Sequence, residues 1–473
     1  MTSELFMNLA KESICYHEKL SHLPVGVKAS CEELNSMVDM TLPEEGEPPD
    51  IAIQTLIKSA ESGLIKSTGS RYFGFVIGGS TPVSVAADWL TSIWDQNAQV
   101  YSTSPAASII EDVVAKWLLD LLDLPEESGV GFVTGAHMAN FTSLVVARNA
   151  VLRHYGWDAE VDGLQGSPHV NLVCGECCHA TVLSAIHLMG LGNKNIRTVR
   201  ADDEGRIDLE AFKYTLDTCS GPTIVCVQAG NVNTGAFDPI ADIINLAKER
   251  CAWVHVDGAF GLWAHASQRF KNLVSGVEGA DSWATDAHKW LNVPFDSGIV
   301  IVRDPELHRN FKTGRCAYAG PPREDCRDGS QWVPENSRRA RGFVLYAALR
   351  HLGRKGVRQV IDNCCDLAQA FASELAQLPN VRILNSVVLN QVLCRIEPES
   401  VTDIDAFNTS VALRIQQDGI CWIGTTQWHG QTALRISVSN WSTTIDDVRQ
   451  SIASIMKSIE RELVDCSPTK ACT

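Results

Sequence analysis

The chain lacks a surplus of positive charge and has no long apolar run. Its 473 residues carry 40 Lys and Arg against 56 Asp and Glu, which gives a net charge of −16. This excess of negative charge repels phosphates and argues against a nucleic-acid partner. No cluster of Lys and Arg indicates an anionic membrane surface, and no apolar stretch reaches the roughly 20 residues that a bilayer span requires. We therefore expect a protein that binds neither nucleic acid nor membrane.

The start of the chain and its cysteines also lack signals of export. Residues 1–10 (MTSELFMNLA) have no basic start and no apolar core, so we expect no signal peptide and a cytoplasmic location. The 16 cysteines are about 3% of the residues, below the density of a disulfide scaffold, and we expect them to be reduced. Residues 174–177 (CGEC) form a CxxC without a matching second pair or a histidine cluster. We interpret these thiols as packing groups and expect no metal site.

The length and the order of predicted elements indicate an α/β protein. Residues 1–70 are predicted to form helices that are interrupted by an acidic, Pro-rich connector at 41–49 (TLPEEGEPP). These residues form an N-terminal arm that cannot bury its own apolar face. From about 105 to 310, strands alternate with helices, the pattern of a largely parallel sheet with crossover helices. We therefore expect a large domain at 71–350 and a small α+β domain at 351–473.

Two polar residues stand at the ends of predicted strands in the large domain. Residues 253–260 (WVHVDGAF) are an apolar run that ends at Asp257, and residues 281–291 (DSWATDAHKWL) lead to Lys289, about 32 positions later. One strand–crossover–strand step has this length and brings both residues to the same sheet edge. A lysine that condenses with an aldehyde and an aspartate that keeps a pyridine nitrogen protonated suit pyridoxal phosphate (PLP) above other cofactors. Taken alone, a solvated loop lysine and a strand-end cap are the alternatives.

Two further motifs fit the same ligand. Residues 174–179 (CGECCH) follow an apolar run and lead into a helical stretch at 180–189, which places His179 at a strand-to-helix turn. An imidazole there can stack on a flat ring, and a helix cap is the alternative. Residues 130–142 (VGFVTGAHMANFT) read as a strand, a glycine turn and a helix start. The free N–H groups of such a helix N-terminus can bind a phosphate.

With these motifs the chain resembles the group II PLP-dependent decarboxylases, the family of aromatic-L-amino-acid, tyrosine and glutamate decarboxylases. The resemblance runs from about residue 71 to about residue 439, and its most specific parts are residues 255–259 (HVDGA) and 286–290 (DAHKW). It implies an α/β fold of the PLP-dependent transferase-like class (aminotransferase fold type I). This fold has a mostly parallel seven-stranded central sheet, an N-terminal helical arm and a small α+β C-terminal domain. A homodimer with active sites at the subunit interface is also implied.

The resemblance gives a role to each matching residue. Lys289 would hold the cofactor as a Schiff base, Asp257 would pair with the pyridine nitrogen, and His179 would stack on the ring. The other positions expected at the cofactor are Ala259 beneath the ring, Ala136, His137 and Met138 along the phosphate turn, Asp286 and His288 beside the phosphate and the lysine, and Asn233, where family members often carry a threonine.

The reaction type depends on a tyrosine. Residues 313–330 form a loop rich in glycine, proline and alternating charge. In the family, a tyrosine on such a loop is thought to protonate Cα after carbon dioxide leaves, and Tyr318 stands in a similar place; an aromatic anchor for the loop is the alternative. The resemblance therefore implies decarboxylation of an aromatic or related L-amino acid to its amine. A decarboxylative oxidative deaminase that gives an aldehyde and a non-catalytic dimeric scaffold remain as alternatives.

Substrate contacts are expected from a segment that, in relatives acting on aromatic amino acids, supplies apolar side chains from the partner subunit. Asn97 and Gln99 lie near it, and Phe75, Ile77 and Tyr101 are the apolar candidates. This mixed lining fits a polar or hydroxylated side chain as well as a plain aromatic one. Arg435, on a predicted C-terminal strand, is a candidate contact for the α-carboxylate, with a surface arginine as the alternative.

Overall fold

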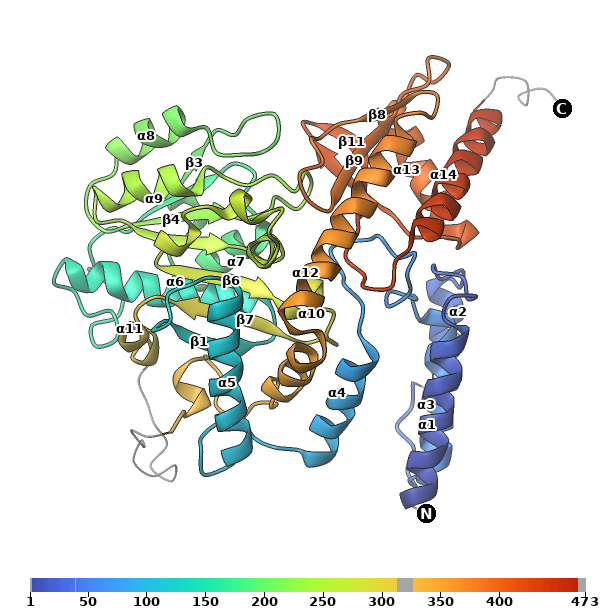
Figure 1. Ribbon diagram of the computed structural model, residues 1–473, viewed down its shortest axis with the longest axis horizontal. Helices are drawn as coiled ribbons and strands as arrows, with labels where there is room; N and C mark the ends of the chain where they lie inside the picture. Colours follow the sequence, from blue (N-terminus) through green and yellow to red (C-terminus); the bar gives the residue numbers. More distant parts are fainter. Residues whose placement is uncertain (1, 39, 313–325, 467–473) are drawn as a thin grey trace.

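Figure 1 shows the computed structural model of the chain, which describes residues 2–38, 40–312 and 326–466. A seven-stranded sheet forms the centre of the larger part, and a four-stranded sheet lies to one side of it. The long helix α12 (Gly342–Leu375) runs between the two sheets. The N-terminal helices stand apart from the large sheet, next to α4 (Pro82–Trp94).

The large sheet has the strand order β1-β7-β6-β5-β4-β2-β3. Strand β7 is antiparallel to β1 and β6, and the other neighbours are parallel. The strands are β1 (Gly129–Val133), β2 (Asn171–Gly175), β3 (Ile196–Val199), β4 (Thr223–Gln228), β5 (Trp253–Asp257), β6 (Ser282–Asp286) and β7 (Gly298–Val302). All of them except β3 are buried along their whole length, which explains why they read as continuous apolar runs. The predicted mostly parallel sheet of seven strands is confirmed.

Helices cover both faces of this sheet. Successive residues of a strand point to opposite faces, so Val225 and Ile224 on β4 enter two different apolar clusters. The cluster around Val225 contains side chains from α5, α8, α9 and α12, and the cluster around Ile224 contains side chains from α6 and α7. The helices of the larger part not yet given are α5 (Pro105–Leu121), α6 (Ala136–His154), α7 (Ala180–Leu188), α8 (Leu209–Asp217), α9 (Ile240–Lys248), α10 (Ala287–Trp290) and α11 (Pro305–Arg309).

Local sequence sets the starts of two of these helices. The side chain of Thr81 accepts a hydrogen bond from the backbone of Ser84 at the start of α4, and Ser104 does the same for α5. A proline follows each cap in the first helical turn, where its missing N–H costs nothing. Helices α4 and α5 therefore begin directly after their caps, at Pro82 and Pro105.

The smaller part is an antiparallel sheet covered by helices. Its strand order is β10-β11-β9-β8. Its elements are β8 (Val381–Ile383), β9 (Gln391–Ile396), α13 (Ile404–Asp418), β10 (Gly424–Trp428), β11 (Gln431–Ser437) and α14 (Ile445–Asp465). Helix α12 enters this part across Gly353, whose φ of 58° and ψ of 179° break the helical path. This break lies close to the expected domain boundary at 350/351, although the division into domains itself stays a prediction.

The N-terminal arm has no interior of its own. It consists of α1 (Thr2–Lys19), α2 (Cys31–Ser36) and α3 (Pro49–Ala60), and none of the helix residues whose burial is described is buried. Large apolar side chains are exposed along it, at Phe6, Met7, Ile14, Ile51 and Leu56. Among the described residues, no helix has both the length and the apolar character that crossing a membrane requires.

Candidate active site

The three residues expected to carry the chemistry meet at one edge of the large sheet. Asp257 is the last residue of β5, Lys289 lies in α10 directly after β6, and His179 immediately precedes α7. Because β2, β4, β5 and β6 are parallel neighbours, their carboxyl ends open on the same side. A cavity of about 250 Å³ lies there, and all three residues line it.

Most of the predicted cofactor-binding residues line this cavity. They are Ala136, His137, His179, Asp257, Ala259, Asp286, His288 and Lys289. The remaining lining residues are Gly135, Thr181, Gln228, Gly230, Val232 and Phe260. The structure thus brings together segments that lie more than 150 positions apart in the chain.

Lys289 is held beside a buried carboxylate. Its Nζ atom lies 3.1 Å from Oδ2 of Asp286, and the two side chains are 21% and 4% exposed. The following residues, Trp290 and Leu291, are buried in the core. The amine is therefore largely shielded from bulk water while it borders the cavity, the setting in which a lysine can attack an aldehyde.

The predicted phosphate turn meets the same carboxylate. Oδ1 of Asp286 accepts a 2.6 Å hydrogen bond from the backbone N–H of Ala136, the first residue of α6. Gly135 precedes this helix and supplies no side-chain cap, so backbone N–H groups and the positive end of the helix dipole border the cavity. A side chain at Gly298 would collide with the backbone of Gly135, and its absence lets the turn approach β7 closely.

His288 is a neutral donor toward Asp286. Its Nδ1 atom accepts a 3.1 Å hydrogen bond from the backbone N–H of Ser297, which leaves the ring proton on Nε2. Nε2 lies 3.5 Å from Oδ1 of Asp286. Burial lowers the pKa of His288, although the charge of Asp286 opposes that shift.

Asp257 presents a carboxylate that the protein holds in one orientation. The residue is 5% exposed. Oδ1 accepts a hydrogen bond from the backbone N–H of Ala259 at 3.2 Å, and Oδ2 accepts one from Nδ2 of Asn140 at 3.2 Å. A fixed carboxylate at the end of the cavity can pair with a protonated ring nitrogen.

His179 caps α7 and lines the cavity at the same time. Its Nδ1 atom accepts a hydrogen bond from the backbone N–H of Thr181 at 3.3 Å and lies 2.8 Å from Oγ1 of that residue. Burial lowers the pKa of His179, and the charge of Asp257 works in the opposite direction. His179 therefore does cap α7, the role considered above as the alternative to ring stacking, and this cap orients the imidazole at the cavity wall.

The chemistry of these groups fits PLP. One cavity is bordered by an amine for the aldehyde, a carboxylate for the ring nitrogen, an imidazole beside the ring and helix N–H groups for the phosphate. Over residues 2–38, 40–312 and 326–466, no group of three or more His, Cys, Asp and Glu side chains could hold a metal ion.

Three predicted residues do not line the cavity. Met138 packs with the apolar cluster on the α6 side of the sheet. Asn233 accepts a 2.9 Å hydrogen bond from Oγ1 of Thr426 through its side-chain oxygen. Arg435 donates from a terminal guanidinium nitrogen to the backbone oxygen of Val232, a lining residue, at 3.3 Å. Their functional roles stay predictions.

The substrate candidates also lie outside the cavity of this protomer. Phe75 is 59% exposed and stacks on Trp422 with ring centroids 5.8 Å apart, and Ile77 is half-buried. Oδ1 of Asn97 accepts from the backbone N–H of Gln99 at 3.1 Å. These positions were expected to act across a subunit interface, so their role stays a prediction, as does that of Tyr318, which lies outside the described residues.

Several cavity residues were missed at the sequence level. Thr181, Gln228, Val232 and Phe260 line the cavity, and Asn140 stands behind it and donates to Asp257. The sequence contained a usable signal for Asn140, because it lies four positions after Ala136 and hence on the same face of the predicted helix. The others flank predicted residues and give no separate signal.

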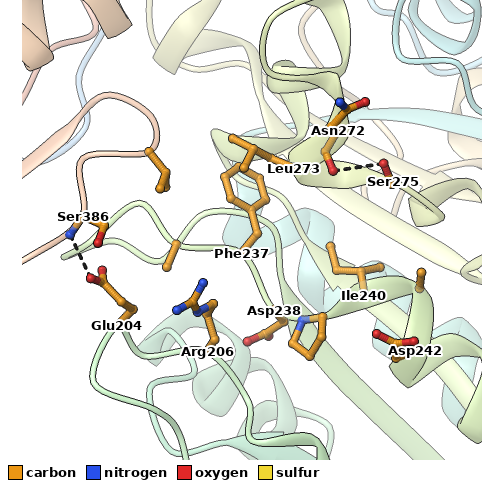
Figure 2. Close-up of a pocket in the computed structure, with 14 residues that line it drawn as sticks. Glu204, Arg206, Phe237, Asp238, Ile240, Asp242, Asn272, Leu273, Ser275 and Ser386 are labelled. Carbon is orange, nitrogen blue, oxygen red and sulfur yellow. Dashed lines mark hydrogen bonds between the residues drawn. The ribbon is translucent and has the colours of Figure 1, made fainter.

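A second cavity, of about 300 Å³, lies between loops of the large sheet and the β8–β9 loop (Figure 2). Glu204 at its wall accepts a hydrogen bond from the backbone N–H of Ser386 at 2.8 Å. Burial raises the pKa of Asp238, also at this wall, to about 6. Among the described residues that line this cavity there is no lysine or histidine, the groups proposed to bind PLP in the first cavity.

Comparisons with known proteins agree with this geometry. Residues 32–397 match the family model described as the pyridoxal-dependent decarboxylase conserved domain. The aromatic-L-amino-acid decarboxylase of Bacillus atrophaeus is 26% identical over 456 residues, with 93% of this chain and 92% of that protein covered. The acidic amino acid decarboxylase GADL1 of Xenopus tropicalis is 26% identical over 361 residues, with 75% and 70% covered. The crystal structure of Oryza sativa TDC with PLP and tryptamine matches with a TM-score of 0.90 at 23% identity, over 97% of this chain and 98% of that one, which confirms the predicted fold.

Proposed function

The chain belongs to the pyridoxal-dependent decarboxylase family, a PLP-dependent lyase of amino acids, and we propose that it converts an aromatic or related L-amino acid into its amine and carbon dioxide. The observation that carries this proposal is the convergence of Lys289, Asp257 and His179 on one cavity beside the N-terminus of α6. The bound cofactor supplies an electron sink for the bond that breaks at Cα.

Each residue at the cavity has a proposed task. Lys289 would bind the cofactor aldehyde covalently, and Asp257 would hold a proton at the pyridine nitrogen. His179 and Ala259 would contact the ring. The N–H groups at Ala136 and His137, with His288 and Asp286 beside them, orient the phosphate. These tasks divide the work into binding, protonation and orientation.

The preference for an aromatic or related substrate draws support from the cavity wall. Phe260, Val232 and Ala259 offer apolar surface, while Gln228 offers an amide. The two relatives named above share the same identity with this chain although one name says aromatic and the other acidic, so similarity alone does not choose between them. We assign the α-carboxylate to Arg435, which contacts the carbonyl of Val232 at that wall.

Purified protein loaded with PLP and offered a panel of L-amino acids tests the proposal. We expect carbon dioxide and the matching amine in equal amounts from an aromatic substrate. Peroxide and aldehyde as main products would replace the proposed reaction with oxidative deamination. No turnover of any amino acid, together with no cofactor uptake, would favour a scaffold.

Tyr318→Phe should shift the products. Without the phenol, Cα lacks its proposed proton donor, so amine formation should fall by about 10²-fold while aldehyde and peroxide rise as a share of product. The measurement is the ratio of amine to aldehyde in the two proteins under oxygen. Tyr214→Phe, at an exposed site on α8, is the matched control, and it should leave the ratio unchanged. An unchanged ratio in Tyr318→Phe would remove this tyrosine from the mechanism.

We propose that the protein works as a homodimer in which the arm, residues 1–70, clasps the partner. Helix α4 exposes Trp89, Leu90, Ile93 and Trp94, which we name the α4 patch. In the view of Figure 1 the arm and α4 lie on the same side of the large sheet, and both carry exposed apolar side chains. An apolar surface of this kind marks an interface.

The double variant Leu90→Glu/Ile93→Glu should be monomeric. Two carboxylates in an apolar interface would lose hydration without gaining partners, at a cost of several kcal/mol. Sedimentation should give a mass near 51.6 kDa for the variant and about twice that for the wild type. Tyr214→Glu, at an exposed site on α8, is the control and should stay dimeric. A monomeric wild type with full activity would contradict the proposal.

A further inference from the structure

Asn140 joins Asp257 to His179 through hydrogen bonds inside the protein. It lies near the start of α6 and is fully buried. Its Nδ2 atom lies 3.2 Å from Oδ2 of Asp257 and 3.3 Å from Oγ1 of Thr181. Its Oδ1 atom lies 2.9 Å from Nε2 of His255. One amide side chain therefore contacts three polar groups behind the cavity.

The neighbours fix the direction of these bonds. A carboxylate only accepts hydrogen bonds, so the amide must turn Nδ2 toward Asp257 and its oxygen toward His255. The reverse orientation would set an oxygen against the carboxylate and leave Asp257 without this donor. His255 therefore donates through Nε2, and its Nδ1 accepts from the hydroxyl of Ser282, 2.9 Å away.

All hydrogen bonds from Trp253 to Asp257 run in the same donor-to-acceptor direction. It begins at the indole N–H of Trp253, which can only donate and lies 2.9 Å from Oγ of Ser282. It continues through His255, whose pKa burial lowers to about 3, so this ring is neutral. It ends at Asp257, which can only accept. The donor and the acceptor of each hydrogen bond in the series are thereby assigned. Hydrogen bonds that run in one direction polarise and strengthen one another.

A branch of the same network reaches His179. The second N–H of Asn140 donates to Oγ1 of Thr181, and that hydroxyl lies 2.8 Å from Nδ1 of His179. An oxygen that accepts from Asn140 keeps its own proton to donate onward. Nδ1 of His179 is then an acceptor, and the ring proton must be on Nε2.

We infer that Asn140 is a positioning residue: one amide donates to the Asp257 carboxylate and, through the hydroxyl of Thr181, adds a second donor to Nδ1 of His179 beside the backbone N–H of Thr181. The inference rests on the proposed roles of Asp257 and His179 and adds that these roles are coupled. Removing the amide should disturb the ring-nitrogen partner and the stacking histidine together.

The test reads histidine tautomers directly. In full-length protein with ¹⁵N-labelled histidine, magic-angle-spinning spectra recorded with and without PLP distinguish protonated from unprotonated ring nitrogens. His179→Gln and His255→Gln identify the two signals. In the wild type near neutral pH we expect a single Nε2–H form at both positions. In Asn140→Leu, which removes all three contacts at similar volume, we expect the His255 signal to become a mixture of tautomers. The His179 signal should shift while its proton stays on Nε2, because the backbone N–H of Thr181 still donates to Nδ1.

The effects on kcat and KM should distinguish a positioning role of Asn140 from a role in substrate binding. Asn140 does not line the cavity, so Asn140→Leu should lower kcat by about 10–100-fold with little change in KM. Asn140→Asp should act in the same direction, because a second carboxyl group at this position replaces the amide donor and disfavours the negative charge of Asp257.

Two milder variants keep the inference testable if Asn140→Leu does not fold. Thr181→Val cuts only the side-chain branch and should alter the His179 signal while the His255 signal stays unchanged. Ser282→Ala, at a fully buried site, should leave the His179 signal as in the wild type. An Nδ1–H form of His179 in the wild type, or a His179 signal that is unchanged in both Asn140→Leu and Thr181→Val, would overturn the inference. If the tautomers respond as expected but no amino acid is decarboxylated, the proposed function fails and the coupling stands.

Discussion

Lys289→Met should abolish decarboxylation and the visible absorption of the loaded protein. The change removes the amine that condenses with the cofactor aldehyde and keeps the length of the side chain. Carbon dioxide release should fall by at least about 10³-fold, equivalent to about 4 kcal/mol of transition-state stabilisation. The absorption band expected at about 400–430 nm for the wild type should be absent, because it comes from the imine.

A matched control is available in the same chain. Lys66 is 8% exposed and donates to the backbone oxygen of Leu64 at 2.9 Å, away from the cavity. Lys66→Met loses a shielded amine in the same way, yet it should keep the band and the reaction. If Lys289→Met still bound PLP through an imine that borohydride reduces, another lysine would carry the attachment, and the site described above would be wrong.

The central chemistry could be predicted because its signals are local. Asp257 and Lys289 each follow a buried strand, and the apolar run before each residue is visible in the sequence. Parallel strands end at one edge, so both residues were expected at the same edge, and the adjacency of β5 and β6 then makes them neighbours. His179 and the turn at Ala136 follow from the same rule.

Contacts that depend on the order of the strands in the sheet could not be predicted from the sequence. Asn140 and Asp257 lie 117 positions apart, and only the placement of α6 beneath β5 brings them together. Strand β7 is an apolar run, and such a run has the same character in a parallel and in an antiparallel strand. The sequence therefore does not reveal that β7 is antiparallel and lies between β1 and β6. The strand that carries Arg435 could be predicted from the sequence, but the hydrogen bond from its guanidinium to the backbone oxygen of Val232 could not.

Asp257→Asn should slow the reaction and make it depend on pH. The amide keeps the size of the side chain but loses the charge that stabilises a proton on the pyridine nitrogen, so that nitrogen becomes less basic. We expect kcat to fall by about 10²–10³-fold near neutral pH. As the pH is lowered, solvent can supply the missing proton, so the deficit relative to the wild type should shrink. The measurement is kcat against pH for both proteins.

Asp281→Asn is the control that separates charge at the ring from the loss of a partly buried carboxylate. Asp281 sits at the opposite end of β6, accepts a 2.7 Å hydrogen bond from the backbone N–H of Val254, and has a pKa that burial raises. An asparagine there can still accept that bond through its oxygen, so kcat and its pH dependence should match the wild type. If Asp257→Asn had the same kcat and the same pH profile as this control, Asp257 would not be the partner of the ring nitrogen. The role of Asn140 would then lose its purpose, because the network that it directs would end at a carboxylate with no part in the reaction.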